Sequence, residues 1–519
     1  MSNKTFYITT PIYYVNDKPH LGHAYTSIAC DVAARHKKLD GYDTYFLSGT
    51  DEHGQKVQQA AEAKGIDPQT FTDEVSQVFR DLLPALNCSN NDFIRTTEER
   101  HKKACQELWK MLVKSGDIYL SKYAGWYAVR DEAYYGEDEL KDGPNGKKIA
   151  PSGAECEWVE EESYFFKLSA WGDKLLDLYK SQPDFIMPET RKNEIVSFVK
   201  AGLRDLSVSR TRLTWGVPVP DAPGHVMYVW IDALTNYISA LGFPDEKSDL
   251  YSKFWPGVHM VGKDIIRFHT VYWPAFLMAA GLPIPQHVFA HGWWTIEGQK
   301  MSKSLGNVIA PQDLIDTYGL DQSRYFLLRE VPFGSDGDFS HAQAIARINA
   351  DLANGLGNLA QRTLSFIAKN CGGVVTNAKD LTAEDKALLK YAQEDLIAGL
   401  RKEFDRFAFN KGLEHIMKLV YDANAYIDTQ APWTLKKEGK TERMETVLYV
   451  LTETIRCLGI AIQSVMPASA AKMLDQLAVP ADQRTYEHAS AQYALKSDTG
   501  MPAPEGVFPR LQPKDEKAA

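Results

Sequence analysis

The order of strands and helices is the feature of this sequence that most restricts its fold. Residues 5–47 contain an apolar strand segment, TFYIT, then a helical segment, then a second strand segment, YDTYFL. Strand, helix and strand in this order predict parallel strands. The alternation stops near residue 115 and resumes near residue 225, where VHMVG and HVFAHGWW read as strands. The sequence therefore predicts an α/β fold with an interrupted, doubly wound, Rossmann-like parallel sheet.

The rest of the chain predicts further domains. Residues 116–224 are rich in short aromatic stretches such as YAGWYAV and predict a connective domain inserted between the two halves of the sheet, 1–115 and 225–295. Residues 296–350 contain the loop GQKMSKSLGN. Apolar residues then recur with helical periodicity, so residues 351–519 predict an all-α bundle.

Composition restricts location and partners. The segment MSNKTFYITTP lacks the basic and apolar parts of a secretion signal, and no run of about 18 apolar residues could span a bilayer. We expect no membrane partner. Six cysteines without a Cys-x-x-Cys pair favour a reducing cytoplasm. The net charge of -10 excludes no nucleic acid, because a local basic surface suffices to bind phosphates.

Two short motifs concentrate residues that could bind phosphate. In PHLGH, His20 and His23 lie three residues apart behind a proline, where the first helix should begin. In GQKMSKS, Lys300 and Lys303 have the same spacing. A helix N-terminus attracts phosphate through its free N–H groups and its dipole, and Gly22 would let a ligand approach the backbone. Each motif alone fits an ordinary surface turn. Both together, in one interrupted sheet, predict a phosphate-binding site.

HLGH and KMSKS are the paired signatures of class I aminoacyl-tRNA synthetases, and within that class the sequence closely resembles the methionyl-tRNA synthetases. The resemblance covers nearly the whole chain and includes TTPIYYVNDKPHLGHAYT, GTDEHG, YVWIDALTNY, GKDIIRFH, KMSKSLGN and APW. It implies that L-methionine attacks ATP to give methionyl-adenylate and pyrophosphate. The methionyl group then passes to the terminal ribose of tRNA(Met), for translation initiation and elongation. Mg²⁺ should accompany ATP, bound largely through the phosphates.

The resemblance also assigns residues to ATP. His20 and His23 would bind phosphates in the transition state, while Lys300 and Lys303 would hold the departing pyrophosphate. The ATP-binding residues that it implies are His20, Gly22, His23, Gly262, Lys263, Asp264, Lys300, Ser302 and Lys303. An alternative for GKDI stays open, in which it is only a strand-to-helix turn with Asp264 as the N-cap.

Methionine needs one anion for its ammonium and an adaptable apolar slot for its thioether. By resemblance, Asp51 would meet the ammonium, while Tyr237 and His269 would contact the sulfur. The methionine-binding residues implied are Ile12, Tyr14, Asp51, Trp230, Ala233, Leu234, Tyr237, His269 and Trp273. Apolar residues such as Ile12, Leu234 and Trp273 could equally be ordinary core.

Three residues of the C-terminal third match anticodon-reading positions of the family. Asn358 and Arg362 are spaced i, i+4 on a predicted helix, and Trp433 lies in APW. Asparagine and arginine can bind base edges while tryptophan stacks on a base. The alternative for the first two is a solvent-facing polar pair.

The sequence departs from the family in its metal ligands. Many relatives carry cysteine clusters in the insertion that bind zinc. Here Ala128 and Arg130 lie where a Cys-x-x-Cys would be, and APSGAECEW contributes only Cys156. One thiol cannot build a tetrahedral structural site, so we expect no structural zinc. Aromatic residues should pack there instead: Trp126, Tyr134, Tyr135, Trp158 and Phe165.

Other functions fit less well. Class I synthetases for branched amino acids carry a larger editing insertion, and those for cysteine need zinc ligands that this chain lacks. A small nucleotidyltransferase would not explain the helical C-terminal third. An inactive tRNA-binding paralogue would have lost the phosphate motifs, whose histidines and lysines are all present. Without the oligonucleotide-fold domain that dimerises some relatives, we expect a monomer, and no DNA partner.

Overall fold

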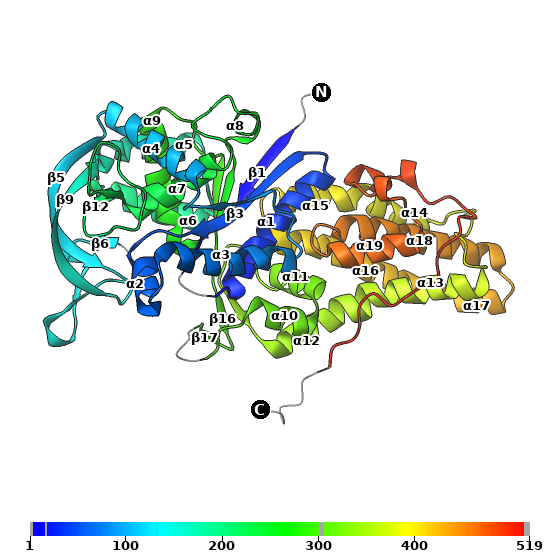
Figure 1. Ribbon diagram of the computed structural model, residues 1–519. Helices are drawn as coiled ribbons and strands as arrows, with labels where there is room; N and C mark the ends of the chain where they lie inside the picture. The colour runs from blue at the N-terminus through cyan, green and yellow to red at the C-terminus, as the bar shows by residue number, and fades with distance from the viewer. Residues whose placement is uncertain (1–3, 16–17, 132, 302–305, 513–519) are drawn as a thin grey trace. The chain divides into compact units, whose positions relative to one another are not determined.

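The computed structural model describes residues 4–15, 18–131, 133–301 and 306–512 (Figure 1). The chain forms two compact units and passes between them more than once. We call Thr5–Pro19 with Thr44–His291 the sheet unit. We call Met1–Lys4 with His20–Asp43 and Gly292–Ala519 the helical unit.

The sheet unit is built on a seven-stranded sheet with strand order β10-β15-β14-β1-β3-β2 and β4 beside β3. Its strands are β1 (Thr5–Thr9), β2 (Tyr13–Tyr14), β3 (Asp43–Asp51), β4 (Asp92–Arg95), β10 (Ile186–Met187), β14 (Val258–Gly262) and β15 (His287–His291). Strand β14 pairs in parallel with β1, with Ile8 opposite Val258, despite the long segment between them. The predicted interrupted, doubly wound parallel sheet is confirmed.

Helices of the sheet unit supply much of its core. They are α2 (Gln55–Lys64), α3 (Pro68–Ala85), α4 (Glu99–Lys114), α5 (Gly172–Ser181), α6 (Glu189–Lys200), α7 (Val229–Ser239), α8 (Asp249–Phe254) and α9 (Trp273–Ala280). One hydrophobic cluster joins Leu47 of β3, Leu108 of α4, Ile231 of α7 and Phe276 of α9, all fully buried. Each such side chain contributes about 1.5–3 kcal/mol when removed from water. Helices α4 and α7 are thereby packed against each other.

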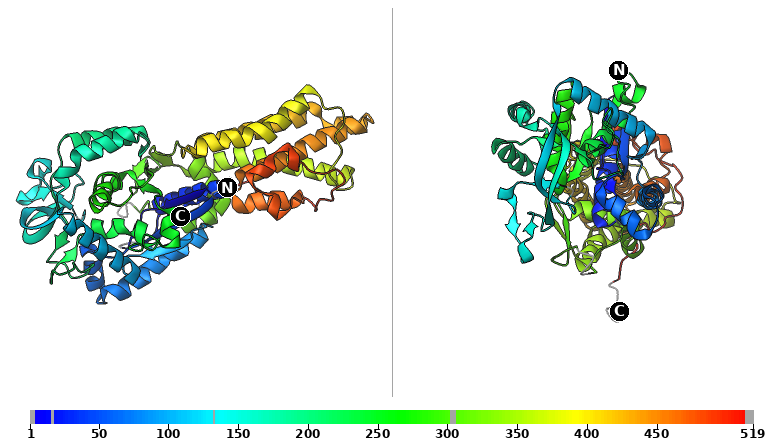
Figure 2. Two further views of the ribbon diagram at one scale, coloured as in Figure 1. Left: turned by 90° about the horizontal axis from the view of Figure 1, so that it is seen from above. Right: turned by 60° about the vertical axis from the view of Figure 1, so that its left-hand side comes forward.

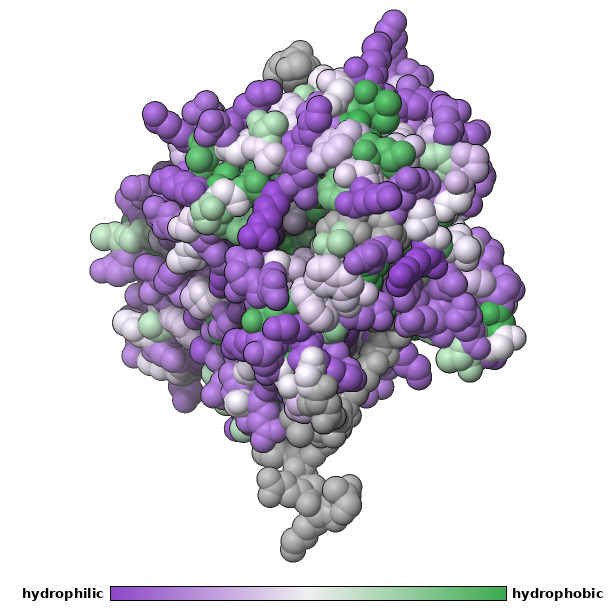
Figure 3. Space-filling view, turned by 90° about the vertical axis from the view of Figure 1, so that its left-hand side faces the viewer, coloured by the Kyte–Doolittle hydropathy of each residue, from purple (hydrophilic) through white to green (hydrophobic). Residues whose placement is uncertain are grey.

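The inserted segment forms a long antiparallel ribbon, visible at the left of Figure 1. Strands β5 (Ile118–Ala128) and β9 (Glu155–Phe166) pair along their length, and β6 (Ala133–Tyr135), β7 (Lys141–Asp142), β8 (Lys148–Ile149) and β11 (Leu206–Ser207) extend the sheet. A second pair joins β12 (Ser209–Arg210) and β13 (Val226–Met227). Figure 3 looks onto this side of the molecule and shows apolar side chains in small groups among hydrophilic ones.

The tip of the ribbon contains a small apolar cluster in the segment where the sequence analysis looks for cysteine ligands. Ala128, Ala150, Ala154 and Cys156 are buried together, with Trp126, Tyr135 and Leu140 packed against them. Asp131 lies three positions after Ala128, next to Arg130, in the segment where such a cysteine pair would be. Asp131 instead accepts hydrogen bonds from the hydroxyls of Tyr135 and Ser152.

The predicted aromatic packing of the ribbon is only partly correct. Trp126 and Tyr135 pack against the apolar cluster. Trp158 contacts Trp126 edge to face but is 51% exposed. The rings of Tyr134 and Phe165 lie against Tyr127 and Tyr119, respectively, because alternate residues of a strand point to opposite faces.

The helical unit is a bundle whose helices run side by side (Figure 2). Its helices are α1 (Leu21–Leu39), α10 (Pro311–Tyr318), α11 (Leu320–Arg329), α12 (His341–Ile348), α13 (Asn358–Asn370), α14 (Ala383–Lys390), α15 (Leu396–Phe404), α16 (Phe409–Gln430), α17 (Pro432–Lys437), α18 (Thr441–Ile462) and α19 (Pro467–Gln476). A π-helical segment, Asn349–Gly357, joins α12 to α13. A small sheet consists of β16 (Trp294–Ile296), β17 (Gln299–Lys300) and β18 (Gly337–Phe339).

Helix α1 belongs to the helical unit, although the predicted catalytic domain 1–115 includes it. Asp31 of α1 is fully buried and accepts hydrogen bonds from Arg324 at 2.6 Å and from Arg35 at 2.8 Å. Asp405 lies 3.1 Å from His36 and 2.7 Å from Lys37 at the other end of α1. The contacts of Asp31 with Arg324, and of His36 and Lys37 with Asp405, fasten α1 to the bundle. Among the described residues, no helix combines the length and the apolar character that crossing a membrane requires.

Candidate active site

Two histidines cap the first helix of the helical unit. Helix α1 begins at Leu21, and His20 is its N-cap. The Nδ1 atom of His20 accepts a hydrogen bond from the backbone N–H of Gly22 at 3.0 Å, and the Nδ1 atom of His23 accepts one from the N–H of His20 at 3.1 Å. An imidazole whose Nδ1 accepts a hydrogen bond carries its proton on Nε2. Both rings, with centroids 4.0 Å apart, therefore have Nε2–H donors.

The backbone N–H groups that the sequence analysis expects to be free at this helix end are occupied. The N–H of Leu21 donates to the carbonyl of Ile309 at 3.0 Å, and those of His23 and Ala24 donate to the carbonyl of His20. Together with the two bonds to imidazole, every backbone N–H from His20 to Ala24 has an acceptor within the protein. The expectation of free backbone donors was wrong. The donors that this motif can offer a phosphate are the imidazole Nε2–H groups.

The imidazole ring of His20 lies against the backbone of Gly22. A Cβ atom at this position would lie 2.9 Å from Cε1 of His20, so a side chain would displace the capping imidazole. The space that the sequence analysis assigns to a ligand is thus taken by His20. Burial, and then the charge of His20, lower the pKa of His23 well below its usual range, so His23 is neutral at pH 7.

Lys300 ends a hairpin of the helical unit. Strands β16 and β17 are joined by Glu297 and Gly298, both with positive φ, which suits a tight two-residue turn. The Nζ atom of Lys300 lies 5.6 Å from the centroid of the Trp293 ring, within range of a cation–π contact. Ser302 and Lys303, also predicted to bind ATP, lie outside the described residues.

In the sheet unit, the GKDI segment forms a close turn after strand β14. Gly262 is the N-cap of a short 3-10 helix, Lys263–Ile265, so the alternative that made Asp264 the N-cap was wrong. A Cβ atom on Gly262 would lie 2.5 Å from Oδ1 of Asp264, so a side chain there would displace that carboxylate. A π-helical segment, Phe268–Tyr272, follows directly before α9. Such segments are frequent at functional sites.

The π-helical segment brings His269 to Tyr237. The Nδ1 atom of His269 donates to the carbonyl of Ile265 at 2.9 Å, so its Nε2 atom must accept the hydrogen bond from the Tyr237 hydroxyl at 2.6 Å. Burial lowers the pKa of His269 to about 4, which keeps the ring neutral at pH 7. The donors of both side chains are thus used within the protein. Their contact with a thioether sulfur stays a prediction, and it would use the ring faces.

Aromatic rings surround this pair. Trp230 stacks on Phe268 with centroids 3.7 Å apart, and Tyr237 stacks on His259 at 3.9 Å. Helix α7 carries Trp230 and Tyr237 together with Ala233 and Leu234, which are buried. Trp273 is fully buried and lies 6.2 Å from Tyr237 between ring centroids. The structure therefore brings together Trp230, Tyr237, His269 and Trp273, as the sequence analysis predicts for one binding site.

The remaining residues predicted to bind methionine lie at the edge of the sheet. Asp51 is the last residue of β3, and Tyr14 of β2 is its partner in the parallel register. Ile12 is partly buried against the main core of the unit. Carboxyl ends of parallel strands are where ligands bind such sheets.

A buried cluster close to these residues was not predicted from the sequence. His53 and His101 each contact one oxygen of the Asp232 carboxylate, at 2.6 Å and 2.7 Å between the nearest N and O atoms. The signal was present in two motifs, because GTDEHG contains His53 and YVWIDALTNY places a single charged residue, Asp232, in an otherwise uncharged helix.

In the helical unit, two of the predicted anticodon residues are neighbours. The guanidinium carbon of Arg362 lies 5.2 Å from the centroid of the Trp433 ring, and Arg362 also donates to Asp428 at 2.7 Å. Trp433 is 37% exposed. Asn358 is the first residue of α13, the helix that also carries Arg362.

Comparison with known proteins identifies the family. Residues 6–364 match the family described as tRNA synthetases class I (M), and residues 375–519 match the anticodon binding domain of methionyl tRNA ligase. The chain belongs to the methionine–tRNA ligases. The methionine–tRNA ligase of Mesorhizobium japonicum is 56% identical over 98% of each chain, and that of Brucella suis is 55% identical over the full length of both.

A solved methionine–tRNA ligase has the same fold. The Mycobacterium tuberculosis methionyl-tRNA synthetase, in complex with methionyl-adenylate, superposes with a TM-score of 0.95 and 50% identity, covering 98% of this chain and all of the other. The predicted family, fold class and enzyme class, a class I aminoacyl-tRNA synthetase, are therefore confirmed.

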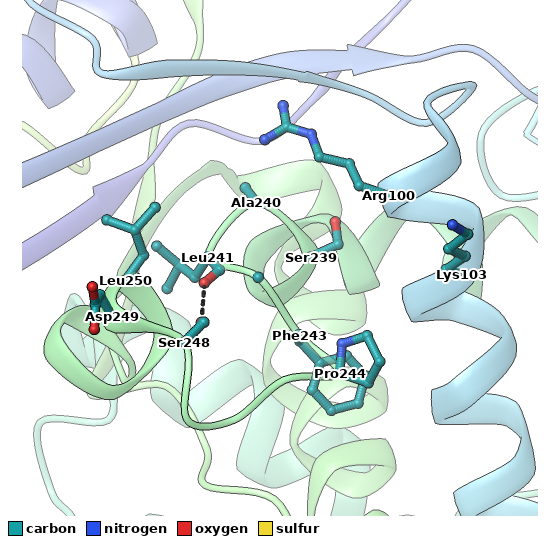
Figure 4. Close-up of a pocket in the computed structure, with 11 residues that line it drawn as sticks. Arg100, Lys103, Ser239, Ala240, Leu241, Phe243, Pro244, Ser248, Asp249 and Leu250 are labelled. Carbon is teal, nitrogen blue, oxygen red and sulfur yellow. Dashed lines mark hydrogen bonds between the residues drawn. The ribbon is translucent and has the colours of Figure 1, made fainter.

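A cavity of about 440 Å³ lies elsewhere in the sheet unit of this protein (Figure 4). Arg100 and Lys103 of α4 line it on one side, and the end of α7 with the segment that follows, from Ser239 to Pro244, lines it on another. The residues predicted to bind ATP or methionine are not among its lining residues.

Proposed function

We propose that this chain activates L-methionine with ATP, giving methionyl-adenylate and pyrophosphate, and transfers the methionyl group to the 3′ terminal ribose of tRNA(Met). The observation that carries the proposal is the full-length likeness to a synthetase solved with methionyl-adenylate. Amino-acid-dependent ATP–pyrophosphate exchange across the twenty amino acids tests it. Exchange should depend on methionine; strong exchange with leucine or valine and none with methionine would refute the proposal.

The phosphate chemistry is assigned to the two motifs of the helical unit. A carboxylate oxygen of methionine attacks the α-phosphate, and the bond between this phosphorus and the pyrophosphate oxygen breaks. Negative charge grows on the phosphate oxygens, where the Nε2–H donors of His20 and His23 would act. Lys300 and Lys303 would hold the pyrophosphate. Each contact is worth about 2–4 kcal/mol, by analogy with single oxyanion donors.

Methionine recognition is assigned to the sheet unit. Asp51 would bind the ammonium, and the aromatic group around Tyr237 and His269 would enclose the thioether. Because one methylene in an apolar pocket is worth only about 1–3 kcal/mol, analogues such as norleucine should be activated weakly. Gly262, Lys263 and Asp264 would contact the nucleotide.

We propose a metal ion with ATP but none in the ribbon. Mg²⁺ would accompany ATP, held largely by phosphate oxygens, and would supply charge neutralisation. No structural zinc is proposed, since Ala128, Ala150 and Ala154 are buried together and Cys156 is the one thiol among them. Elemental analysis of the purified protein tests this, and stoichiometric zinc would overturn it.

The C-terminal helices would read the tRNA anticodon through Asn358, Arg362 and Trp433. We further propose that the protein is cytoplasmic and monomeric. All six cysteines are free thiols in the structure, which suits a reducing compartment. Light scattering coupled to gel filtration tests the monomer, and a mass twice that of the chain would contradict it.

A further inference from the structure

A buried carboxylate in the sheet unit is held between two histidines from different parts of the chain. Asp232 lies in helix α7, His53 follows strand β3, and His101 lies in helix α4. The Nδ1 atom of His53 is 2.6 Å from Oδ2 of Asp232, and the Nε2 atom of His101 is 2.7 Å from Oδ1. The three side chains are at most 3% exposed. Each carboxylate oxygen thus accepts one imidazole N–H, which sets the tautomer of both rings.

The carboxylate keeps its charge in this surrounding. Burial alone would raise the pKa of Asp232, but the charges and hydrogen bonds of His53 and His101 hold it well below its usual range. The hydroxyl oxygen of Ser239 lies 2.9 Å from Nδ1 of His101 and completes the chain of contacts. Buried networks of this kind fix geometry when each member has its partners.

The cluster contains residue types that bind metals, but the protonation of their ligand atoms does not suit a metal ion. The ligand atoms of His101, Cys105 and Asp232 lie within 4.8 Å of one another. Metal ligands must be deprotonated. The Nε2 atom of His101 carries the proton that it donates to Asp232. Burial, and then the charge of Asp232, raise the pKa of the Cys105 thiol well above its usual value. The cluster is therefore a hydrogen-bonded one.

His53, a member of this cluster, lies two positions after Asp51, the residue predicted to bind the ammonium. Asp51 is followed by Glu52, whose carboxylate accepts two hydrogen bonds from Arg95, at 2.7 and 2.9 Å. The carbonyl of Glu52 accepts one from Trp215 at 2.6 Å. His53, the next residue, is held by Asp232. Asp51 is thus followed by two consecutive residues whose side chains are anchored to other elements. This anchoring restricts the position of Asp51 and the direction of its side chain.

We propose that His53, Asp232 and His101 are positioning residues for methionine, which lock the segment that carries Asp51 onto helix α7. This proposal rests on the proposed assignment of Asp51 to the methionine ammonium. We call these three residues the clamp. Helix α7 also carries Trp230 and Tyr237, so the clamp sets the spacing between the ammonium site and the thioether site. With both oxygens of Asp232 used, that carboxylate does not compete for the ammonium. A displacement of about 1 Å in such a site can lower kcat/KM by about 100-fold.

Paired variants separate this role from simple loss of packing. The side-chain amide of asparagine can place an N–H near the Nδ1 position of a histidine, and that of glutamine near the Nε2 position. His53→Asn and His101→Gln should therefore keep the hydrogen bond to Asp232, whereas His53→Leu and His101→Leu remove it. Ser163→Ala is a matched control, because it removes the bond between two buried serines, 2.6 Å from Ser207, in the ribbon of the same unit.

The readout is methionine-dependent ATP–pyrophosphate exchange by the full-length protein, with folding followed by circular dichroism. The leucine variants should raise the KM for methionine by about 10- to 100-fold and leave the KM for ATP and kcat within about threefold. The asparagine, glutamine and control variants should stay within about threefold throughout. Competition by 4-(methylthio)butanoate, which lacks the ammonium, should change by less than about threefold in every variant.

Several outcomes would decide against the clamp. A folded His53→Leu protein with an unchanged KM for methionine would overturn it. So would equal losses for methionine, ATP and 4-(methylthio)butanoate with no recovery in His53→Asn, which a merely structural cluster predicts. If the leucine variants do not fold, Asp232→Asn keeps the volume and removes one acceptor, and it must still raise the KM for methionine. A wild-type protein without methionine-dependent exchange would instead refute the proposed function.

Discussion

The guanidinium of Arg362 lies over the ring of Trp433, 5.2 Å from its centroid, and ties helix α13 to the short helix α17. The contact leaves the indole 37% exposed. An exposed aromatic ring beside a cation is a stacking surface for an unpaired base. The arrangement supports assignment of this pair to the anticodon.

Trp433→Ala should therefore weaken methionylation of tRNA and leave ATP–pyrophosphate exchange nearly unchanged. Loss of one base stack is worth about 1–3 kcal/mol, or about 5- to 150-fold in the kcat/KM for tRNA. Trp158→Ala is the control, because Trp158 is also exposed but lies in the ribbon of the sheet unit. Equal loss of both reactions in the Trp433 variant would contradict the assignment.

His20→Asn should separate helix capping from catalysis. Asparagine is a favoured N-cap, so its side-chain oxygen can accept the N–H of Gly22 and keep the free energy of unfolding within about 0.5 kcal/mol. It has no donor in the place of Nε2–H, so exchange should fall about 100- to 1000-fold. Asp67→Asn, a similar change at the N-cap of α3, should leave exchange unaltered. A His20→Asn protein with normal exchange would remove His20 from the phosphate site.

Gly22→Ala should reduce exchange by at least about tenfold through displacement of the His20 ring. The new Cβ would lie 2.9 Å from that ring, closer than real Cβ contacts. Gly172→Ala is the control, since a Cβ there would meet no atom within 4 Å. If both variants keep wild-type exchange and melting temperature, a side chain at position 22 does not displace the His20 ring and the prediction is wrong.

His269 should remain neutral down to about pH 4. Its folded-state pKa of about 4 is below the unfolded value of about 6.5, so the unfolded chain binds the proton first as pH falls. The stability that the neutral ring contributes is complete above about pH 6.5 and declines as pH falls towards 4. His269→Gln should show a shallower fall in the free energy of unfolding over this range than the wild-type protein. A histidine resonance of residue 269 that titrates near pH 6.5 in NMR spectra would contradict this.

The parallel sheet and the family could be predicted because they depend on local patterns. Strands β1 and β14 are short apolar runs bounded by turns, and their motifs stand intact in the sequence. Their pairing follows from the alternation of strands and helices. Tyr237 and His269 were expected at one site for the same reason, since both stand in family motifs.

Other features depend on contacts that no local pattern records. Histidine is not among the favoured N-cap residues, so the use of His20 to occupy the backbone donors of α1 could not be foreseen. The clamp of His53, Asp232 and His101 joins three separate segments. The only sequence signal for it was one charged residue, Asp232, in an otherwise uncharged helix. Helix α1 is joined to the helical unit partly by the contact of Asp31 with Arg324, which lies 293 residues further along the chain.

The buried pair of Asp31 and Arg324 also limits how this protein can be divided. A gene fragment that begins at residue 292 would encode the arginine without the carboxylate that neutralises it, and both side chains are fully buried. Removal of one partner from a buried ion pair destabilises a protein by about 3–5 kcal/mol. The C-terminal helices are therefore not a detachable module. Part of their stability comes from helix α1, which begins at the histidine motif.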